Sequence, residues 1–465
     1  MSLFTVSEIK RATGGVPEEK RTGRRSVGAV CIDSRKVERG CLFIALEGAR
    51  TDGHEHLEEA VSKGCSVCLV ARRWWSRHGA RFSALARRSG AAIVVVSETL
   101  RALQDLAVFH LDRFPELVRV GITGSNGKTT TKEIVGSILR RVGPTAVSEG
   151  NLNSDIGLPL AAFRVNETHR FAVFEMGMNR RGEMDELVRI ARPQAALITN
   201  VGTAHIEFLK TRDRIALEKK KIFRCFTGGE RGFLYEGEPY FELLSEGVRG
   251  EIIPFGPKST RGYRGSQDLG LDGMTIDWEG LQVRFPLFGH HNLLNALGAI
   301  TLTSALGADR RAVKDGLEDT RPLFGRSEIL RDDITLIHDS YNANPDSVRA
   351  VLDFFHKIPW NGNKLVVLGS MLELGEETRE AHEQIVALAL GLPFDGIFLF
   401  GNEMLEAVRA SEPRDREVQC FGTDDFESLL LELRKSVRAG DLVLLKGSRS
   451  LRMERLVDPL TKSAA

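Results

Sequence analysis

A glycine-rich loop followed by lysine and threonine is the part of this sequence best suited to chemistry. Residues 118–131 read Val-Arg-Val-Gly-Ile-Thr-Gly-Ser-Asn-Gly-Lys-Thr-Thr-Thr, and an apolar helical pattern follows. Such a loop directs backbone N–H groups at phosphate oxygens, and the positive end of the following helix favours an anion. Lys128 would reach the β- and γ-phosphates of a nucleotide, and the Thr129 hydroxyl would bind Mg²⁺. The predicted nucleotide-contacting residues are Gly124, Ser125, Asn126, Gly127, Lys128, Thr129 and Thr130.

The match to a phosphate-binding loop is incomplete at one position. The general pattern begins with a glycine where this chain has Ile122. A plain glycine turn between a strand and a helix is therefore the simpler alternative. The combination of strand, glycine loop, Lys-Thr pair and helix, in that order, nevertheless favours a nucleotide site.

An acid and a histidine follow two later apolar runs. Residues 171–174 lead into Glu175, and residues 195–198 lead through a polar turn to His205. Ligands of open parallel sheets bind beyond the carboxyl ends of the strands, so we expect both side chains beside the phosphate loop. Glu175 would be a Mg²⁺ ligand, and a histidine there suggests a second metal ion. A helix-capping role is the alternative for a lone glutamate.

Further polar segments lie at turns or on helices. Two of them fall within residues 33–54, beside strands, and residues 151–157 form a glycine-containing polar loop. A basic cluster at residues 218–223 is by default a solvated helix face. Asn292 and Asn295 share one face of a helix. Each pattern alone is more simply explained as an ordinary turn or surface.

Three α/β domains are expected to position these residues. Short strands and an amphipathic helix predict a small α/β domain over residues 1–114. The phosphate loop opens a central, ATPase-like parallel-sheet domain over residues 115–319, and residues 320–465 predict a Rossmann-like, doubly wound unit. This last unit lacks a glycine fingerprint for a dinucleotide, so NAD binding is not favoured. The expected strands are 42–46 and 93–96 in the first domain and 334–337, 365–368, 397–400 and 442–445 in the last.

Composition excludes several classes of protein. The 465 residues include 64 basic and 63 acidic side chains, so the net charge of +1 does not favour nucleic acid or a membrane surface as a partner. Among the six cysteines, Cys65 and Cys68 alone have a two-residue spacing, and they are expected to be buried thiols because no second Cys/His pair lies at zinc spacing. The sequence shows neither a signal peptide nor about 18 consecutive apolar residues. We therefore expect a cytoplasmic monomer without membrane insertion.

Taken together, these residues resemble the Mur ligases over essentially the whole chain. The phosphate loop is common to that superfamily, so the flanking segments make the resemblance specific. The segments that carry it are Asp33-Ser34-Arg35, Leu42–Gly48, Asp52-Gly53-His54, Thr123–Thr130, Asn151-Leu152-Asn153, Glu175-Met176-Gly177, Asn200-Val201-Gly202, His205, His291-Asn292, Asn295, Asp339–Pro345 and Lys446–Glu454.

The resemblance implies a uridine-nucleotide-binding first domain, an ATPase-like second domain and a Rossmann-like third domain that closes over the site. The implied activity is ATP-dependent amide formation through an acyl phosphate, with two Mg²⁺ ions. UDP-N-acetylmuramoyl-tripeptide and D-alanyl-D-alanine are the expected substrates. Ser154 and Ser370 depart from the family, which commonly has Asn and Asp there.

The resemblance also implies roles for individual residues. Lys128, Glu175, His205 and Lys219 would be catalytic, and Thr129, Glu175, His205 and Lys219 would serve the metal ions. Lys219 aligns with a lysine that the family carbamylates. ATP would also contact Asn292, Asn295, Arg326 and Asp339. The other substrates would contact Ser34, Arg35, Asp52, Gly53, His54, Asn151, Asn153, Asn342, Asn344, Lys446, Ser448 and Arg449.

Three alternatives remain open at this point. A sibling ligase would add a single amino acid to the same kind of precursor. A folylpolyglutamate-synthase-like ligase would leave the first domain without a role. An ATP-binding regulatory module would keep the loop without turnover, although the presence together of Lys128, Thr129, Glu175, His205 and Lys219 argues against it.

Overall fold

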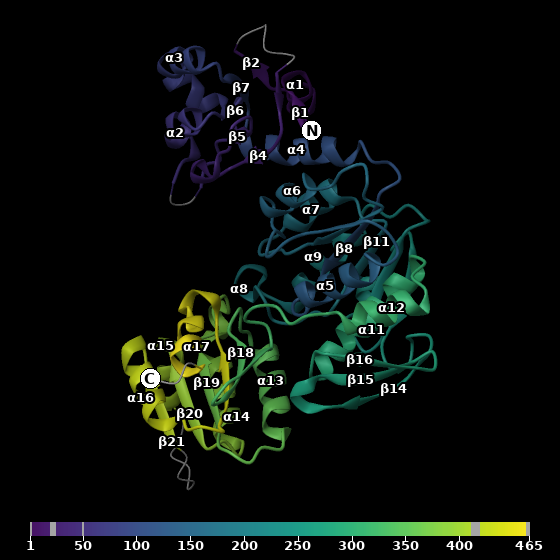
Figure 1. Ribbon diagram of the computed structural model, residues 1–465, viewed down its shortest axis with the longest axis vertical. Coiled ribbons are helices and arrows are strands. Elements are labelled where there is room, and N and C mark those ends of the chain that lie inside the picture. Colours follow the sequence, from purple (N-terminus) through teal and green to yellow (C-terminus); the bar gives the residue numbers. More distant parts are fainter. Residues whose placement is uncertain (1, 19–24, 49–50, 411–418, 462–465) are drawn as a thin grey trace. The chain divides into compact units, whose positions relative to one another are not determined.

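The computed structural model describes residues 2–18, 25–48, 51–410 and 419–461 (Figure 1). The chain forms two compact units. One contains the residues up to 121, 144–177 and 185–193, and the other contains 122–143, 178–184 and the residues from 194 onward. None of the described helices is both long and apolar enough to cross a membrane.

A five-stranded sheet with the order β2-β7-β6-β5-β4 lies in the first unit. Its parallel centre is formed by β5 (Leu42–Ile44), β6 (Val67–Ala71) and β7 (Ala92–Val96). β4 (Val30–Cys31) pairs in parallel with β5, and β2 (Val16–Pro17) pairs antiparallel with β7. The other early elements are β1 (Phe4–Thr5), α1 (Val6–Thr13), β3 (Ser26–Val27), η2 (Ser34–Lys36), η3 (Gly53–His56), α2 (Leu57–Ser62), α3 (Arg72–Ser89) and α4 (Thr99–Leu111).

Both faces of this sheet are covered, which explains why its strands are apolar throughout. Leu42, Ile44 and Leu69 belong to one core cluster, whereas Phe43 and Cys68 belong to another. Successive side chains of a strand point to opposite faces, so a parallel strand buried on both sides has no polar alternation.

A six-stranded central sheet has the order β13-β12-β11-β8-β10-β9. The pairs β9–β10, β11–β12 and β12–β13 are parallel. Its strands are β8 (Val118–Thr123), β9 (Thr145–Val147), β10 (Phe171–Glu175), β11 (Ala195–Ile198), β12 (Arg231–Tyr235) and β13 (Glu251–Phe255). The accompanying helices are α5 (Lys128–Leu139), α6 (Gly157–Ala162), α7 (Glu183–Ala191), α8 (Ile206–Leu209), α9 (Arg212–Lys220), η4 (Lys221–Phe223), α10 (Phe241–Ser245), α11 (His290–Ala305) and α12 (Arg310–Glu318). A small antiparallel sheet contains β14 (Tyr263–Asp268), β15 (Met274–Trp278) and β16 (Leu281–Phe285), with η5 (Gly270–Asp272).

The last part of the chain forms a second six-stranded sheet, drawn in green to yellow in Figure 1, with the order β17-β18-β22-β19-β20-β21. All its neighbouring pairs are parallel except β17–β18. The strands are β17 (Glu328–Arg331), β18 (Thr335–Asp339), β19 (Lys364–Gly369), β20 (Gly396–Phe400), β21 (Gln419–Thr423) and β22 (Leu442–Lys446). The helices are α13 (Pro345–Lys357), η6 (Gly375–Glu377), α14 (Thr378–Gly391), α15 (Asn402–Ala410), α16 (Phe426–Ser436), η7 (Arg449–Leu451), η8 (Met453–Leu456) and α17 (Val457–Thr461).

The predicted strands of this sheet are confirmed as β18, β19, β20 and β22, but two edge strands were not predicted. β17 and β21 are only partly buried, and their sequences lack the continuous apolar run of the central strands. An edge strand has one neighbour and needs less apolar surface, so its signal in the sequence is weaker.

Candidate active site

The phosphate loop adopts a conformation that its glycines make possible. It connects the end of β8 to the start of α5, and Gly124 and Gly127 have φ angles of 150° and 79°. A Cβ on Gly124 would lie 1.8 Å from Thr199 Oγ1, and one on Gly127 would lie 2.4 Å from Asn295 Oδ1. Both positions therefore exclude any larger residue.

Ile122, the departure from the general pattern, belongs to β8 and is fully buried. The strand thus extends to Thr123, and the tight turn begins only at Gly124. A glycine at position 122 would sit inside a strand, where it has no conformational role. The simpler alternative of a plain turn does not explain how closely the loop is packed.

The end of β11 holds the loop from the side. Asn200 accepts a hydrogen bond from the backbone N–H of Asn126 (3.0 Å) with Oδ1, and its carbonyl accepts one from the N–H of Ser125 (2.9 Å). The Ser125 hydroxyl in turn accepts a hydrogen bond from the N–H of Gly202 (2.8 Å). The loop and the end of β11 are therefore joined by hydrogen bonds to backbone groups on both segments.

Lys128 and Lys219 lie close enough to affect each other electrostatically. The Lys128 ammonium donates hydrogen bonds to the carbonyl oxygens of Gly124 (2.8 Å) and Ser125 (3.2 Å). Burial is the largest cause that lowers the pKa of Lys219 well below its usual value, and the charge of Lys128 lowers it further, whereas Glu218 raises it. A neutral amine is thus favoured at position 219.

Lys219 differs from the two lysines that follow it. Its side chain is 1% exposed, whereas Lys220 and Lys221 are half-buried. Lys221 donates a hydrogen bond to Glu218 Oε2 (2.7 Å), and Glu218 Oε1 accepts one from the N–H of Gly182 (2.8 Å). The default interpretation of this cluster as a solvated helix face is therefore wrong for Lys219.

Glu175 ends β10 in the first unit and is buried. The amide of Asn153 donates a hydrogen bond to its Oε1 (2.7 Å), and the backbone carbonyl of Asn153 accepts one from the N–H of Gly177 (2.9 Å). Asn153 therefore orients the expected metal ligand. Asn151 is exposed in the same loop, and Ser154 accepts the N–H of Gly157 (3.1 Å) at the start of α6.

His205 has a specific partner in the last part of the chain. Its Nδ1 lies 2.6 Å from Glu373 Oε2, and both residues have positive φ angles, of 65° and 63°. The hydrogen bond from His205 is the main cause that lowers the pKa of Glu373. Because an ionised carboxylate only accepts, Nδ1–H donates and Nε2 is left as the atom that could bind a metal ion.

Asn292 and Asn295 share a face of α11, as predicted, and both are buried. Asn295 donates to Asn292 Oδ1 (3.1 Å), and Asn292 donates to the carbonyl of Phe288 (2.9 Å). The neighbouring His291 has a pKa lowered first by burial, while the charge of Asp339 raises it. Asn295 therefore lies beside the loop residue Gly127, and the neighbouring His291 lies within electrostatic reach of Asp339.

Asp339, at the end of β18, joins several of the predicted residues of the last part of the chain. Its Oδ2 lies 2.9 Å from the Lys446 ammonium, which also donates to the carbonyl of Asn342 (2.6 Å). The Arg326 guanidinium lies over the ring of Tyr341, 3.9 Å from its centroid. An anion bound here would thus meet two cations, the buried Lys446 and the partly exposed Arg326.

Three other predicted substrate contacts have structural partners. Asn344 caps α13 and donates to Asn126 Oδ1 of the phosphate loop (2.7 Å). The Ser448 hydroxyl accepts the N–H of Leu372 (3.1 Å), and Arg449 lies 3.3 Å from Glu454. Asn344 thereby brings the last sheet to the phosphate loop.

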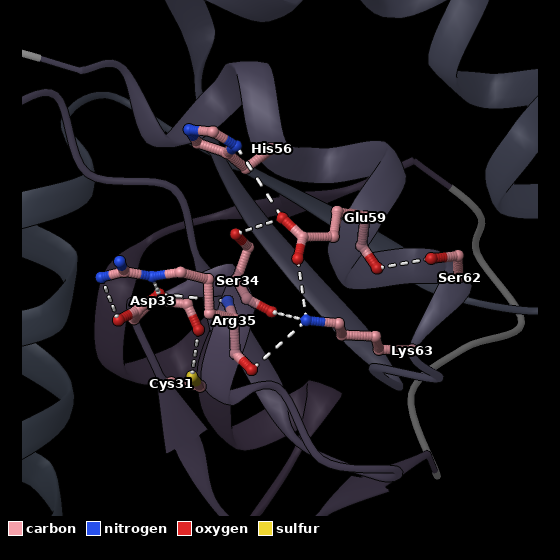
Figure 2. A network of polar contacts seen from close by, with 8 residues as sticks. All are labelled: Cys31, Asp33, Ser34, Arg35, His56, Glu59, Ser62 and Lys63. Atoms are coloured by element: carbon pink, nitrogen blue, oxygen red, sulfur yellow. Dashed lines mark hydrogen bonds and ion pairs between the residues drawn. The ribbon is translucent and has the colours of Figure 1, made fainter.

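In the first unit, the segment around Ser34 and Arg35 belongs to a polar network (Figure 2). The Ser34 hydroxyl donates to Glu59 Oε2 (2.6 Å), and Lys63 donates to Glu59 Oε1 (2.8 Å) and to the Ser34 carbonyl (3.1 Å). Arg35 is exposed and donates twice to Asp33, whose pKa it lowers to about 2. These side chains fix the backbone from which Arg35 projects.

Asp52, Gly53 and His54 form a tight turn. A Cβ on Gly53 would lie 2.8 Å from the backbone of Leu46. His54 is fully buried and lies 2.6 Å from Asp52 Oδ1 through Nδ1, while its Nε2 accepts the N–H of Ala71 (2.9 Å). Both ring nitrogens therefore have hydrogen-bond partners that order the turn, and the substrate contact of His54 stays a prediction.

Within the described residues, one group of three His, Cys, Asp or Glu side chains lies close enough together to share a metal ion: Glu47, Asp52 and His54. Because both nitrogens of His54 already have hydrogen-bond partners, the cluster is explained without a metal ion.

Several residues that order the site have no role predicted from the sequence. Thr199 and Asn200 hold the loop, Glu373 holds His205, and Asp346 Oδ2 accepts the N–H of Thr203 (3.0 Å). Glu373 and Asp346 are far from their partners along the chain, so a single sequence carries no signal for these pairs. Asn200 follows the end of a strand beside a turn, as Glu175 ends one, so its place beside the phosphate loop could have been predicted in the same way.

The fold and the phosphate loop define the class of protein. The chain belongs to the Mur ligase family. Residues 122–303 match the Mur ligase middle domain, residues 325–449 match the Mur ligase glutamate ligase domain, and residues 26–74 match the Mur ligase family catalytic domain. The three-domain prediction is thereby confirmed, while the boundaries at 114/115 and 319/320 stay predictions.

Individual relatives make the comparison more specific. The UDP-N-acetylmuramoyl-tripeptide–D-alanyl-D-alanine ligase of Treponema pallidum is 40% identical over 464 residues, which cover 99% of each chain. A crystal structure of MurF from Acinetobacter baumannii has a TM-score of 0.87 at 29% identity and covers 98% of each chain. MurF of Thermotoga maritima, solved in complex with ADP, has a TM-score of 0.77 at 26% identity and covers 93% of this chain and 97% of that chain.

Proposed function

We propose that this chain is a ligase that uses ATP to join D-alanyl-D-alanine to UDP-N-acetylmuramoyl-tripeptide, releasing ADP and phosphate. The observation that carries the proposal is the preformed phosphate loop with Lys128 beside the buried Lys219. It is supported by the full-length similarity to ligases named for that reaction and by the ADP complex of a relative. A cytoplasmic monomer remains our expectation.

The reaction requires activation of a carboxylate. An amine does not displace oxygen from a carboxylate at neutral pH, because that oxygen is a poor leaving group. Transfer of the γ-phosphoryl group from ATP to the carboxylate gives an acyl phosphate and ADP. Attack of the dipeptide amine then forms the amide and releases phosphate. Lys128 would neutralise charge that develops on the transferring group, the largest contribution to such reactions.

Thr129, Glu175, His205 and Lys219 are the residues proposed to serve two Mg²⁺ ions. A hydroxyl and an ordered, buried carboxylate are oxygen ligands of the kind that Mg²⁺ prefers, and Nε2 of His205 is oriented by Glu373. An ammonium group does not fit this set. The lowered pKa of Lys219 supports a neutral amine that can add CO₂ and become an anionic carbamate. When bound, Mg²⁺ neutralises charge on the phosphates.

The two flanking regions are proposed to select the other substrates. Ser34, Arg35, Asp52 and Gly53 would meet the uridine nucleotide in the first domain. Asn151 and Asn153 would support the central substrate loop, where Asn153 already orients Glu175. Asn342, Asn344, Lys446, Ser448 and Arg449 would meet the substrates from the third domain.

A matrix of substrates tests the proposal. The nucleotide tripeptide or dipeptide is combined with D-alanyl-D-alanine, single amino acids or glutamate, and release of phosphate is measured. We expect release to require both the tripeptide nucleotide and the D-alanyl dipeptide. Turnover with free diaminopimelate or lysine, and none with the dipeptide, would identify a sibling ligase. Turnover of a folate with glutamate would identify a folylpolyglutamate-synthase-like enzyme, and no substrate-dependent release would indicate a regulatory module.

A further inference from the structure

A chain of three polar side chains, two of them fully buried, lies beside the residues assigned to ATP. His338, on β18, is fully buried, and its Nδ1 lies 3.0 Å from Glu328 Oε2 on β17. Its Nε2 lies 2.8 Å from the hydroxyl of Ser340, which is also fully buried. We call Glu328, His338 and Ser340 the relay. None of its members belongs to the machinery described above.

The directions of its hydrogen bonds follow from the chemistry of the groups. The Glu328 carboxylate, when ionised, can only accept, so Nδ1–H of His338 donates to it. With Nδ1 as a donor, Nε2 can accept a hydrogen bond from the Ser340 hydroxyl. The two partners thus fix the orientation of the His338 ring. Phe324 covers this ring edge-on, with 4.9 Å between the centroids.

A carboxylate, an imidazole and a serine hydroxyl are hydrogen-bonded in the same order in serine hydrolases. The burial of Ser340 nevertheless excludes nucleophilic catalysis here. A serine nucleophile must meet its substrate, whereas Ser340 has no exposed surface. The relay must therefore act through the residues to which it is attached.

One end of the relay holds the turn that carries Arg326. Glu328 Oε2, the oxygen bonded to His338, also accepts the backbone N–H of Gly325 (3.2 Å). Gly325 has a φ of 66°, and its carbonyl accepts the N–H of Tyr341 (2.9 Å). The Arg326 guanidinium then lies over the Tyr341 ring. The position of Arg326 thus depends on the carboxylate that His338 orients.

The other end of the relay surrounds Asp339. This residue stands between His338 and Ser340 in the chain, and its Oδ1 accepts the backbone N–H of Ser327 (2.9 Å). Ser327 follows Arg326 directly and has a φ of 53°, which only a strongly constrained serine adopts. Arg326 and Asp339, the two residues assigned to the phosphates and to the adenosine, are therefore parts of one block.

We propose that the Glu328–His338–Ser340 relay positions Arg326 and Asp339 for ATP, with His338 as its central positioning residue. The inference rests on the proposed function, because ATP is the ligand of these two residues only there. The relay does not touch substrate. Its effect is to present a cation and a carboxylate at a fixed separation, so that the ATP site does not need to be ordered on binding.

Two substitutions of His338 test its two hydrogen bonds separately. His338→Asn places an amide near the position of Nδ1 and can keep the hydrogen bond to Glu328. His338→Gln places its amide near the position of Nε2 and can keep the bond to Ser340, but it leaves the Glu328 carboxylate without its buried donor. His356→Gln, on α13 in the same domain, is the matched control, since the His356 side chain is hydrogen-bonded to the carbonyl of Leu352, outside the relay.

We expect His338→Gln to raise the KM for ATP and the Kd for ADP, measured by calorimetry, about tenfold. The KM values for the uridine nucleotide and the dipeptide should not change. His338→Asn should change the ATP and ADP values by no more than about twofold, and His356→Gln should change none of them. A merely structural role would lower the melting temperature of both His338 variants without separating ATP from the other substrates.

Direct substitutions of the positioned residues separate the possible failures. Arg326→Ala and Asp339→Ala should each weaken ATP and ADP at least as strongly as His338→Gln. If they do so while both His338 variants bind ADP normally, the relay has no positioning role and the inference is wrong. If Arg326→Ala and Asp339→Ala are themselves silent, their assigned ATP roles are wrong and the inference falls with them. Should the His338 variants not fold, Glu328→Gln, whose side chain is 27% exposed, provides the same comparison.

Discussion

The phosphate loop and the polar network around Ser34 are both expected to bind nucleotide substrates, yet they are ordered by different means. Hydrogen bonds to its own backbone groups hold the loop, and neighbouring atoms leave no space for a Cβ at Gly124 or Gly127. Side chains hold the network, and its ion pair between Glu59 and Lys63 is more than one-third exposed. Exposed ion pairs contribute little individually. Changes in the loop should therefore abolish chemistry, whereas changes in the network should weaken binding by degrees.

Lys128→Ala tests the loop side of this comparison and should have the largest effect. We expect kcat to fall by about 10²–10³ or more, because the variant lacks the cation that neutralises the transferring phosphoryl group. Substrate-dependent phosphate release is the measurement. An unchanged melting temperature must show that the variant is folded. A folded variant with nearly normal turnover would remove Lys128 from the chemistry and with it the contrast between the two regions.

Lys219→Ala should have the next largest effect. We expect kcat to fall about 10²-fold if a carbamate on Lys219 serves the metal ions. A small carboxylate such as acetate should restore part of the activity, because it can occupy the anion position left by the carbamate. Depletion of bicarbonate should also lower the activity of the unmodified protein.

Lys220→Ala is the matched control for Lys219→Ala, since it changes the neighbouring, half-buried lysine of the same cluster. This variant, like Lys221→Ala, should be nearly silent. Equal effects of all three substitutions, without rescue by acetate, would contradict the carbamate and leave the cluster as a structural feature.

The lysine cluster also shows where prediction from the sequence ends. Three identical residues in a row give no local signal for which one is buried, and only packing distinguishes Lys219. The loop was predictable because its function depends on residues adjacent in the chain. The apolar strands were predictable because burial on both faces requires a continuous apolar run. Glu373, by contrast, is 168 residues from His205, so only the folded chain reveals the pair.

The relay provides a second example of this limit. Glu328, His338 and Ser340 lie within thirteen residues, yet no periodic pattern relates them. Their contacts depend on the antiparallel pairing of β17 with β18, in which Glu328 lies opposite His338. β17 is an edge strand that the apolar pattern did not predict, so its partner across the pair could not be predicted either.

Asp52→Ala and Arg35→Ala test the network side and should have intermediate effects. We expect each to raise the KM for the uridine nucleotide several-fold, up to about tenfold for a lost charged hydrogen bond, with the KM for ATP nearly unchanged. Steady-state kinetics with each substrate varied in turn provide the measurement. Arg81→Ala is a suitable control for Arg35→Ala, because it also removes an exposed arginine that is paired with a carboxylate in the first unit. Equal weakening of both nucleotides would mean that these residues act on the fold and not on one site.

Asp33→Asn should have the smallest effect, and its dependence on pH distinguishes the network from the loop. Hydrogen bonds from Arg35 lower the pKa of Asp33 to about 2 in the folded chain, below about 3.9 for an unperturbed aspartate. Because the pKa of Asp33 is lowered on folding, its charge stabilises the fold at pH values above the pKa of the unfolded state, and this contribution is lost as the pH falls towards 2.

At pH 7 the Asp33→Asn variant should melt about one degree lower than the unmodified protein, a small difference because the ion pair with Arg35 is exposed. That difference should shrink as the pH falls below about 4. Thermal melting from pH 7 to pH 3 checks this, with Asp332→Asn as a control at an exposed carboxylate of the other unit. A difference that stays constant or grows at low pH would show that the charge of Asp33 does not order the backbone around Arg35.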